Sequence, residues 1–182
     1  MKNTFIAILR GINVSGQKKI NMAELRQELS NKGLADIQTY IQSGNIVFTS
    51  KMEVHQLVDI IRSSIMNNFG FEVPTLIIPA SRWHLIIDEN PLHNIDIDKL
   101  HVTFLAQLPE KQLVDALPLS PNPNEKYRIV GDVVYVYCPD GYGRTKINNM
   151  FFERKLKSIA TTRNWKTCLK LKEMAQRNPD DD

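Results

Sequence analysis

The apolar residues in the first half of the chain follow two periodicities, which distinguish strands from helices. Residues 5–9 are continuously apolar, as in a strand that is buried on both faces. Residues 22–29 and 54–69 carry apolar positions at helical spacing, and Gly33 and Gly70 suit the ends of these helices. Three further strands are predicted at residues 36–41, 46–49 and 75–78. The order is β-α-β-β-α-β, the split arrangement of ferredoxin-like folds.

Short polar segments mark the turns and helix starts of this half. Asn21 followed by Glu24 is typical of an N-cap with a supporting carboxylate, and Ser50 followed by Glu53 predicts a second capping box. The segment Ser43-Gly44-Asn45 predicts a tight hairpin, because glycine and asparagine tolerate positive φ. These signals separate the apolar runs into distinct elements.

The second half repeats this order of elements without sharing a sequence motif with the first. Its strands are predicted at residues 102–106, 127–130, 133–137 and 159–162, and its helices at 109–117 and 146–157. Within the second of these helices we expect Ile147, Met150 and Phe151 to face inward. A short helix over 81–88 precedes this half, and a last helix runs from about residue 164 to 176.

These patterns predict an α+β fold of two ferredoxin-like split β-α-β halves packed together, plus a C-terminal helix. The expected segments are a first half 1–80, a connecting helix and loop 81–97, a second half 98–163, a C-terminal helix 164–177 and a flexible acidic tail 178–182. If the open faces of the two sheets cover one another, a ligand must bind at the loops. We expect strands one and three of each half to be parallel neighbours, so that the loops after them open on the same edge of the sheet.

Composition and charge narrow the classes of function. The chain has 182 residues with a formal net charge of +3, and no apolar run approaches a membrane span. Its two cysteines, Cys138 and Cys168, exclude a disulfide framework and favour a cytoplasmic, reducing compartment. Residues 141–178 contain ten Lys and Arg against two Glu, a net charge of +8. This asymmetry favours an anionic partner, although a solvated helix face would give the same composition.

The first candidate loop follows the first strand. Arg10 and Lys18 supply positive charge, Gly11 and Gly16 let backbone amides approach a ligand, and Asn13 adds a polar side chain. The spacing does not fit a Walker A loop, because no Ser or Thr follows the lysine to hold magnesium. The alternative is a charged turn that shapes the connection from strand to helix.

The second candidate loop covers residues 139–146. Gly141 and Gly143 give its backbone conformational freedom. Arg144 can bind an oxyanion with two parallel hydrogen bonds, and Lys146 acts as a point charge. Because the loop precedes a helix, the positive end of the helix dipole would favour the same anion. The alternative is a turn followed by a helix cap.

Two further positions carry such alternatives. Thr145 either caps the following helix or donates to an anion. At the start of the last helix, Thr162 or Asn164 is expected to act as a cap, while Arg163 and Trp165 could offer a guanidinium fork and a stacking plane. Arg163 is therefore a candidate ligand-binding residue.

These loops coincide with a family resemblance. The segments 9–14, 39–48, 139–146 and 162–167 resemble signatures of the DUF1697 family of bacterial proteins, in the same order. The resemblance implies a two-part α+β fold for the whole chain. It implies no activity, because the family is one of unknown function, but it favours the polar loops as a site.

We therefore predict a module that binds a phosphate-bearing anion, either a nucleotide or a nucleic acid. An enzyme acting on a phosphorylated or carboxylated small molecule is an alternative, with Asp140 or His101 as the available acid or base. A third hypothesis is an assembly protein whose basic C-terminal region docks an acidic partner. The four scattered histidines lack metal-ligand spacing, and both cysteines suit buried positions, so we expect no metal and no cofactor.

Overall fold

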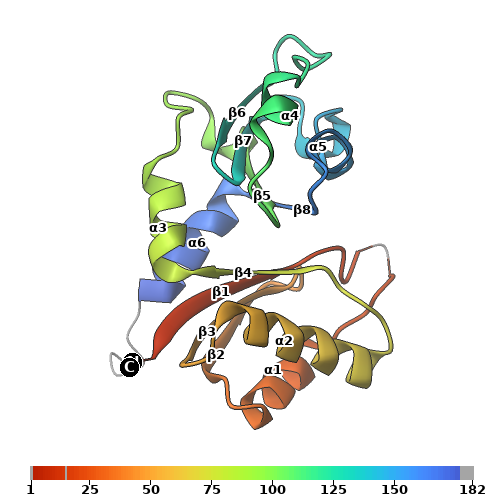
Figure 1. The fold of residues 1–182 in the computed structure, drawn as a ribbon, viewed down its shortest axis with the longest axis vertical. Helices are drawn as coiled ribbons and strands as arrows, with labels where there is room; N and C mark the ends of the chain where they lie inside the picture. The colour runs from red at the N-terminus through yellow and green to blue at the C-terminus, as the bar shows by residue number, and fades with distance from the viewer. Residues whose placement is uncertain (1, 15, 177–182) are drawn as a thin grey trace. The chain divides into compact units, whose positions relative to one another are not determined.

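The computed structural model describes residues 2–14 and 16–176, which form two compact units (Figure 1). The first unit contains the described residues up to Leu85 together with residues 170–176, and the second contains Ile86–Leu169. The acidic segment predicted at 178–182 lies outside the described residues. Within the described ranges, no helix combines the length and the apolar character needed to cross a bilayer.

The first unit is built on one four-stranded antiparallel sheet. Its elements are β1 (Asn3–Leu9), α1 (Met22–Asn31), β2 (Ala35–Tyr40), β3 (Asn45–Ser50), α2 (Val54–Phe69) and β4 (Thr75–Pro79), with α3 (Ala80–Asp88) following. The strand order across the sheet is β2-β3-β1-β4. Figure 1 shows α1 and α2 on one face of this sheet. Both helices pack there on a core that includes Phe5, Leu9, Phe48, Leu25 and Ile61.

The second unit repeats this topology. Its elements are η1 (Ile97–Lys99), β5 (Leu100–Leu105), α4 (Lys111–Asp115), β6 (Lys126–Val130), β7 (Val133–Tyr137), η2 (Tyr142–Arg144), α5 (Asn149–Leu156) and β8 (Ala160–Asn164). The last helix, α6 (Trp165–Gln176), follows β8, and its residues from Lys170 belong to the first unit. The strand order β6-β7-β5-β8 matches that of the first sheet position by position. The predicted α+β fold, with two ferredoxin-like sheets and a C-terminal helix, is therefore confirmed.

One prediction about strand direction is wrong. β1 and β3 are neighbours but antiparallel, with Phe5 opposite Phe48, and β5 and β7 are antiparallel as well. In a split β-α-β unit the crossover makes strands one and two parallel, so the hairpin strand between them must run the opposite way. The loop after strand one and the loop after strand three consequently leave opposite edges of a sheet. The loops 10–20 and 138–146 follow non-equivalent strands of the repeat.

The predicted helix boundaries and faces need two corrections. The capping box of α2 is formed by Glu53 and Gln56, and the Gln56 Oε1 accepts from the Glu53 amide at 3.0 Å. Ser50, predicted to begin this box, is the last residue of β3. In α5, Met150 is 70% exposed and Phe152 is fully buried. The helix begins only after Asn148, so the inward face is displaced from the expected one.

Candidate functional site

The loop between β7 and α5 is a sequence of short turns with defined ends. Gly141 adopts a φ of +90°, which places the following residues in the single 3₁₀ turn η2. The Asn148 side chain then caps α5 by accepting from the Phe151 amide at 3.2 Å. The loop is therefore bounded by a glycine turn and by a capped helix.

Tyr142 fastens this loop to the sheet of the second unit. Its hydroxyl donates to Thr162 Oγ1 at 2.9 Å and accepts from the Asn149 amide at 3.1 Å. Thr162 in turn donates to Asn149 Oδ1 at 2.5 Å, so the 2.6 Å contact between Thr103 and Thr162 must have Thr103 as its donor. The Tyr142 ring stacks on His101, with 4.8 Å between ring centroids. A connected network thus holds the middle of the loop in place.

The titratable groups of this network are held neutral at physiological pH. Burial raises the pKa of Tyr142, against the opposing hydrogen bond to Thr162. Burial likewise lowers the pKa of His101, against the opposing contact with the Lys99 carbonyl. Both rings therefore serve as uncharged supports. The other candidate acid, Asp140, accepts a hydrogen bond from Asn122 Nδ2 at 3.0 Å.

The two cations of the loop have no partner among the described residues. Arg144 and Lys146 are both exposed, and neither side chain makes a hydrogen bond or salt bridge within residues 2–14 and 16–176. Gly143 is also exposed, with open space where a Cβ would stand. Two solvent-facing cations on an anchored, glycine-containing loop can receive an anion without breaking existing contacts.

Three neighbouring positions have structural roles. Thr145 is buried and its Oγ1 accepts from the Ile147 amide at 3.1 Å, while Asn148 provides the helix cap. Asn164 caps α6 by accepting from the Thr167 amide at 2.7 Å. Arg163 follows Thr162 on β8, so its side chain lies on the opposite face of the sheet from the Tyr142 network.

Arg163 accordingly does not join Arg144 and Lys146. Its Nη1 donates to the Thr162 carbonyl at 2.9 Å, and burial lowers its pKa to about 10. Trp165, the stacking plane considered from the sequence, is a buried core residue. The loop cations therefore form a smaller set than the sequence suggested.

In the first unit, the candidate loop uses its polar side chains to hold its own shape. Asn13 donates from Nδ2 to the carbonyls of Gln42 at 2.8 Å and Ile20 at 3.1 Å, and its Oδ1 accepts from the Ile20 amide at 2.9 Å. Lys18 donates from Nζ to the Glu72 carbonyl at 2.8 Å. The loop is thus tied to both neighbouring segments of the same sheet edge.

Arg10 and the two glycines complete this loop. The Arg10 amide donates to the Pro74 carbonyl at 3.0 Å, and its side chain is half-buried. Gly11 and Gly16 have φ values of +68° and +76°, and at neither residue does another atom lie within 4 Å of the position that a Cβ would occupy. The glycines are therefore required by backbone conformation, and the space beside them is open.

Sequence reasoning missed the partners of this loop, which lie at 42–44 and 70–74. The Leu9 amide donates to the Gly44 carbonyl at 2.8 Å, and a Cβ on Gly44 would stand 2.6 Å from the Leu9 Cβ. Gln42 and Glu72 contribute carbonyl groups rather than side chains to the loop contacts described above. A backbone acceptor leaves no trace in residue type, so no sequence signal could have identified them.

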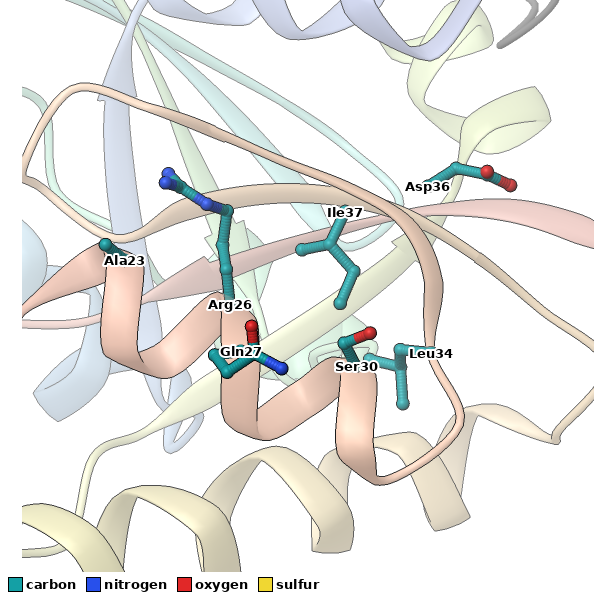
Figure 2. Close-up of a pocket in the computed structure, with 7 residues that line it drawn as sticks. All are labelled: Ala23, Arg26, Gln27, Ser30, Leu34, Asp36 and Ile37. Atoms are coloured by element: carbon teal, nitrogen blue, oxygen red, sulfur yellow. The ribbon is translucent and has the colours of Figure 1, made fainter.

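A hollow of about 440 Å³ lies between α1 and the outer strand β2 (Figure 2). Ile37 points into it, while the Asp36 carboxylate points away. Arg26, at its upper rim in Figure 2, donates from Nη1 to Thr39 Oγ1 at 2.6 Å. Its charged groups are thus turned aside or already bonded, and Gln27 and Ser30 are its uncharged polar lining residues.

The cysteines give no sign of a nucleophile. Burial raises the pKa of Cys138 to about 11 and raises that of Cys168 further. Both thiols are therefore protonated at neutral pH, as expected of small buried apolar side chains. Within the described ranges, no three His, Cys, Asp or Glu side chains cluster as metal ligands would.

Comparison with known proteins gives a family and a similar solved structure but no activity. The model of the family described as a protein of unknown function, DUF1697, matches residues 2–135. The conserved bacterial protein SP0830 from Streptococcus pneumoniae is similar in structure, with a TM-score of 0.71 and 27% sequence identity over 97% of this chain and 100% of that one. No curated protein matches. The region that the family model matches ends before the loop 139–146.

Proposed function

Because the chain belongs to the DUF1697 family, whose description assigns no activity, we propose its function from the residues of one loop. The protein binds a phosphate-bearing ligand, a nucleotide or a nucleic acid, through Arg144 and Lys146. The observation that carries this proposal is that both cations are unpaired among the described residues while Tyr142 fixes the loop that presents them.

The chemistry of the loop fits an oxyanion. The guanidinium group of Arg144 offers two parallel N–H donors to a phosphate, and Lys146 adds a compact charge two residues later. Gly141 and Gly143 keep side chains away from the approach to the backbone, as the open space at both positions indicates. Because the Tyr142 network already orders the loop, binding costs little further conformational entropy.

The loop 10–18 has a smaller part in this proposal. Asn13 and Lys18 make the loop contacts described above, so an anion there would have to share their hydrogen-bonding capacity. Arg10, Gly11 and Gly16 are its expected contributors. We therefore expect substitution of Arg10 to weaken anion binding less than substitution of Arg144.

A binding assay with and without the loop cations tests the proposal. Nucleotides, single-stranded RNA and single-stranded DNA are titrated at two salt concentrations against the wild type, Arg144→Ala and Lys146→Ala. Loss of a charge-assisted contact predicts an affinity at least about tenfold lower for Arg144→Ala, since such hydrogen bonds contribute about 1.5–3 kcal/mol. For a polyanion, each lost phosphate contact also lowers the salt slope by about 0.7.

The matched control is Lys155→Ala, which removes an exposed cation of α5 outside the loop. It should leave affinity close to that of the wild type. Equal losses for Lys155→Ala and Arg144→Ala would indicate a diffuse charge effect and contradict a site at the loop. Wild-type protein that binds none of the three ligands at low salt would contradict the proposal as a whole.

A further inference from the structure

The second unit contains a cavity of about 470 Å³ at the outer edge of β6, on residues that the anion-binding proposal does not use. It is lined by the exposed apolar residues Leu119, which is 89% exposed, and Pro123, and by the half-buried ring of Tyr127. The Tyr127 hydroxyl donates to the Pro118 carbonyl at 2.8 Å and its ring meets Phe152 edge-on, so this wall is fixed. The Tyr127 side of the cavity is therefore preformed, as small-molecule sites usually are.

A buried carboxylate lines this cavity. Glu125 is 8% exposed, and its Oε2 accepts from Ser120 Oγ at 2.5 Å. Among the described residues Glu125 forms no salt bridge, and Oε1 has no hydrogen-bond donor. An ionised carboxylate accepts about four hydrogen bonds, so most of the capacity of this group is unused beside an open cavity.

We propose that this cavity binds a neutral planar ring with two adjacent N–H donors, the hydrogen-bonding edge of a guanine base, with Glu125 as its acceptor. A carboxylate with two oxygens matches a pair of parallel N–H donors, as it does in bidentate pairing with arginine. The fixed ring of Tyr127 and the apolar walls suit the faces of an aromatic ring. The hydrogen bonds from the two N–H donors to the buried Glu125 carboxylate select this ligand over others of the same shape.

The charges around the cavity distinguish a neutral ring from a cation. Lys126 and Arg128 line the same cavity, so two positive charges accompany the single negative charge of Glu125. This balance opposes a guanidinium or ammonium ligand but not a neutral base.

A series of uncharged nucleosides tests this inference without any phosphate. We expect guanosine to bind the wild-type protein. Inosine should bind at least about tenfold more weakly, because it lacks the second N–H donor. Adenosine should bind weakest, because its ring nitrogen accepts a hydrogen bond where the ring nitrogen of guanine donates one. Calorimetry or ligand-observed nuclear magnetic resonance measures these affinities. Equal affinity for guanosine and adenosine, or no guanosine binding, overturns the inference. Tighter binding of an arginine with blocked ends than of guanosine overturns the assignment of a neutral ligand.

The acceptor is tested by Glu125→Gln, which replaces one oxygen with a donor at nearly constant volume. Guanosine affinity should fall at least about tenfold, while the matched variant Glu110→Gln, at an exposed helix cap with no side-chain capping bond, binds like the wild type. Unchanged affinity in folded Glu125→Gln overturns the role of Glu125. If that variant does not fold, the nucleoside series on the wild type still tests whether the cavity binds a guanine ring. Because guanosine carries no phosphate, failure of the nucleoside series is separable from failure of the anion-binding proposal.

Discussion

Replacing Gly44 by alanine should destabilise the first unit more than any other glycine substitution of the same kind in that unit's loops. Gly44 is buried in the turn between β2 and β3, with a φ of +79°. A Cβ there would stand 2.6 Å from the Leu9 Cβ and 2.9 Å from the Ile12 Cδ1. The contact with Leu9 is the harder one, because that atom is fixed by a buried central strand.

Two separable terms set the magnitude. Placing any residue with a Cβ in the left-handed region costs about 1–2 kcal/mol. Forcing extra volume into a packed site costs a further 1–3 kcal/mol or so. The sum predicts a loss of about 2–5 kcal/mol for Gly44→Ala. Gly11→Ala isolates the first term, because Gly11 has a φ of +68° and no atom within 4 Å of its Cβ position.

Urea denaturation followed by circular dichroism measures both variants. We expect Gly11→Ala to lose about 1–2 kcal/mol and Gly44→Ala about 1–3 kcal/mol more, with the same dependence on urea concentration. Equal losses in the two variants would refute the steric reasoning, because only the backbone term would then be present. A larger loss for Gly11→Ala would contradict the described packing of the turn.

Three further outcomes are expected in the second unit. Tyr142→Phe removes the acceptor of the Asn149 amide and should lower the free energy of unfolding by about 1–3 kcal/mol in thermal or urea melts, whereas no change would contradict the anchoring network. Burial lowers the pKa of folded His101 below its unfolded value, so between these two pKa values the unfolded chain binds more protons than the folded one. The free energy of unfolding should therefore fall as pH drops below about 6.5, and a His101→Phe variant with the same dependence on pH would disprove this assignment. Since burial raises the pKa of both Cys138 and Cys168, iodoacetamide should modify them at neutral pH only after unfolding, and rapid labelling of native protein would show the burial to be wrong.

Local signals predict the elements well where one residue decides the backbone. Asn21 caps α1 by accepting from the Ala23 amide at 3.0 Å, and Gly70 ends α2 in the left-handed conformation, both as its residue type indicates. Ser50 shows the limit of such signals. A capping box is expected from Ser or Thr followed three residues later by Glu or Gln, which fits Ser50–Glu53 but not Glu53–Gln56, where a glutamate stands at the N-cap. The extension of β3 through Ser50 selects the second pair, and strand length depends on cross-strand pairing.

The candidate residues are harder to predict because polarity does not tell whether a side chain bonds inward or outward. The same reasoning singles out Asn13 and Arg144, yet the Asn13 amide is used within the loop and the Arg144 guanidinium is not. It does not single out Glu125, because a lone glutamate beside Lys126 is typical of a solvated turn. The burial of Glu125 depends on the fold of the segment 118–125, in which the Ser120 hydroxyl donates to the Glu125 carboxylate.

The two candidate loops therefore call for different explanations of the same composition. In the loop 10–18, positive φ at four positions and the contacts of Asn13 account for nearly every glycine and polar residue without a ligand. In the loop 141–146, the hydrogen bonds that hold the loop are made by Tyr142 and Thr145, and neither involves Arg144 or Lys146. Arg144 and Lys146 thus have no structural role among the described residues that would explain them. A charge that its own fold does not use is better evidence of a ligand than a charge in a motif, and for that reason we propose the second loop as the anion site.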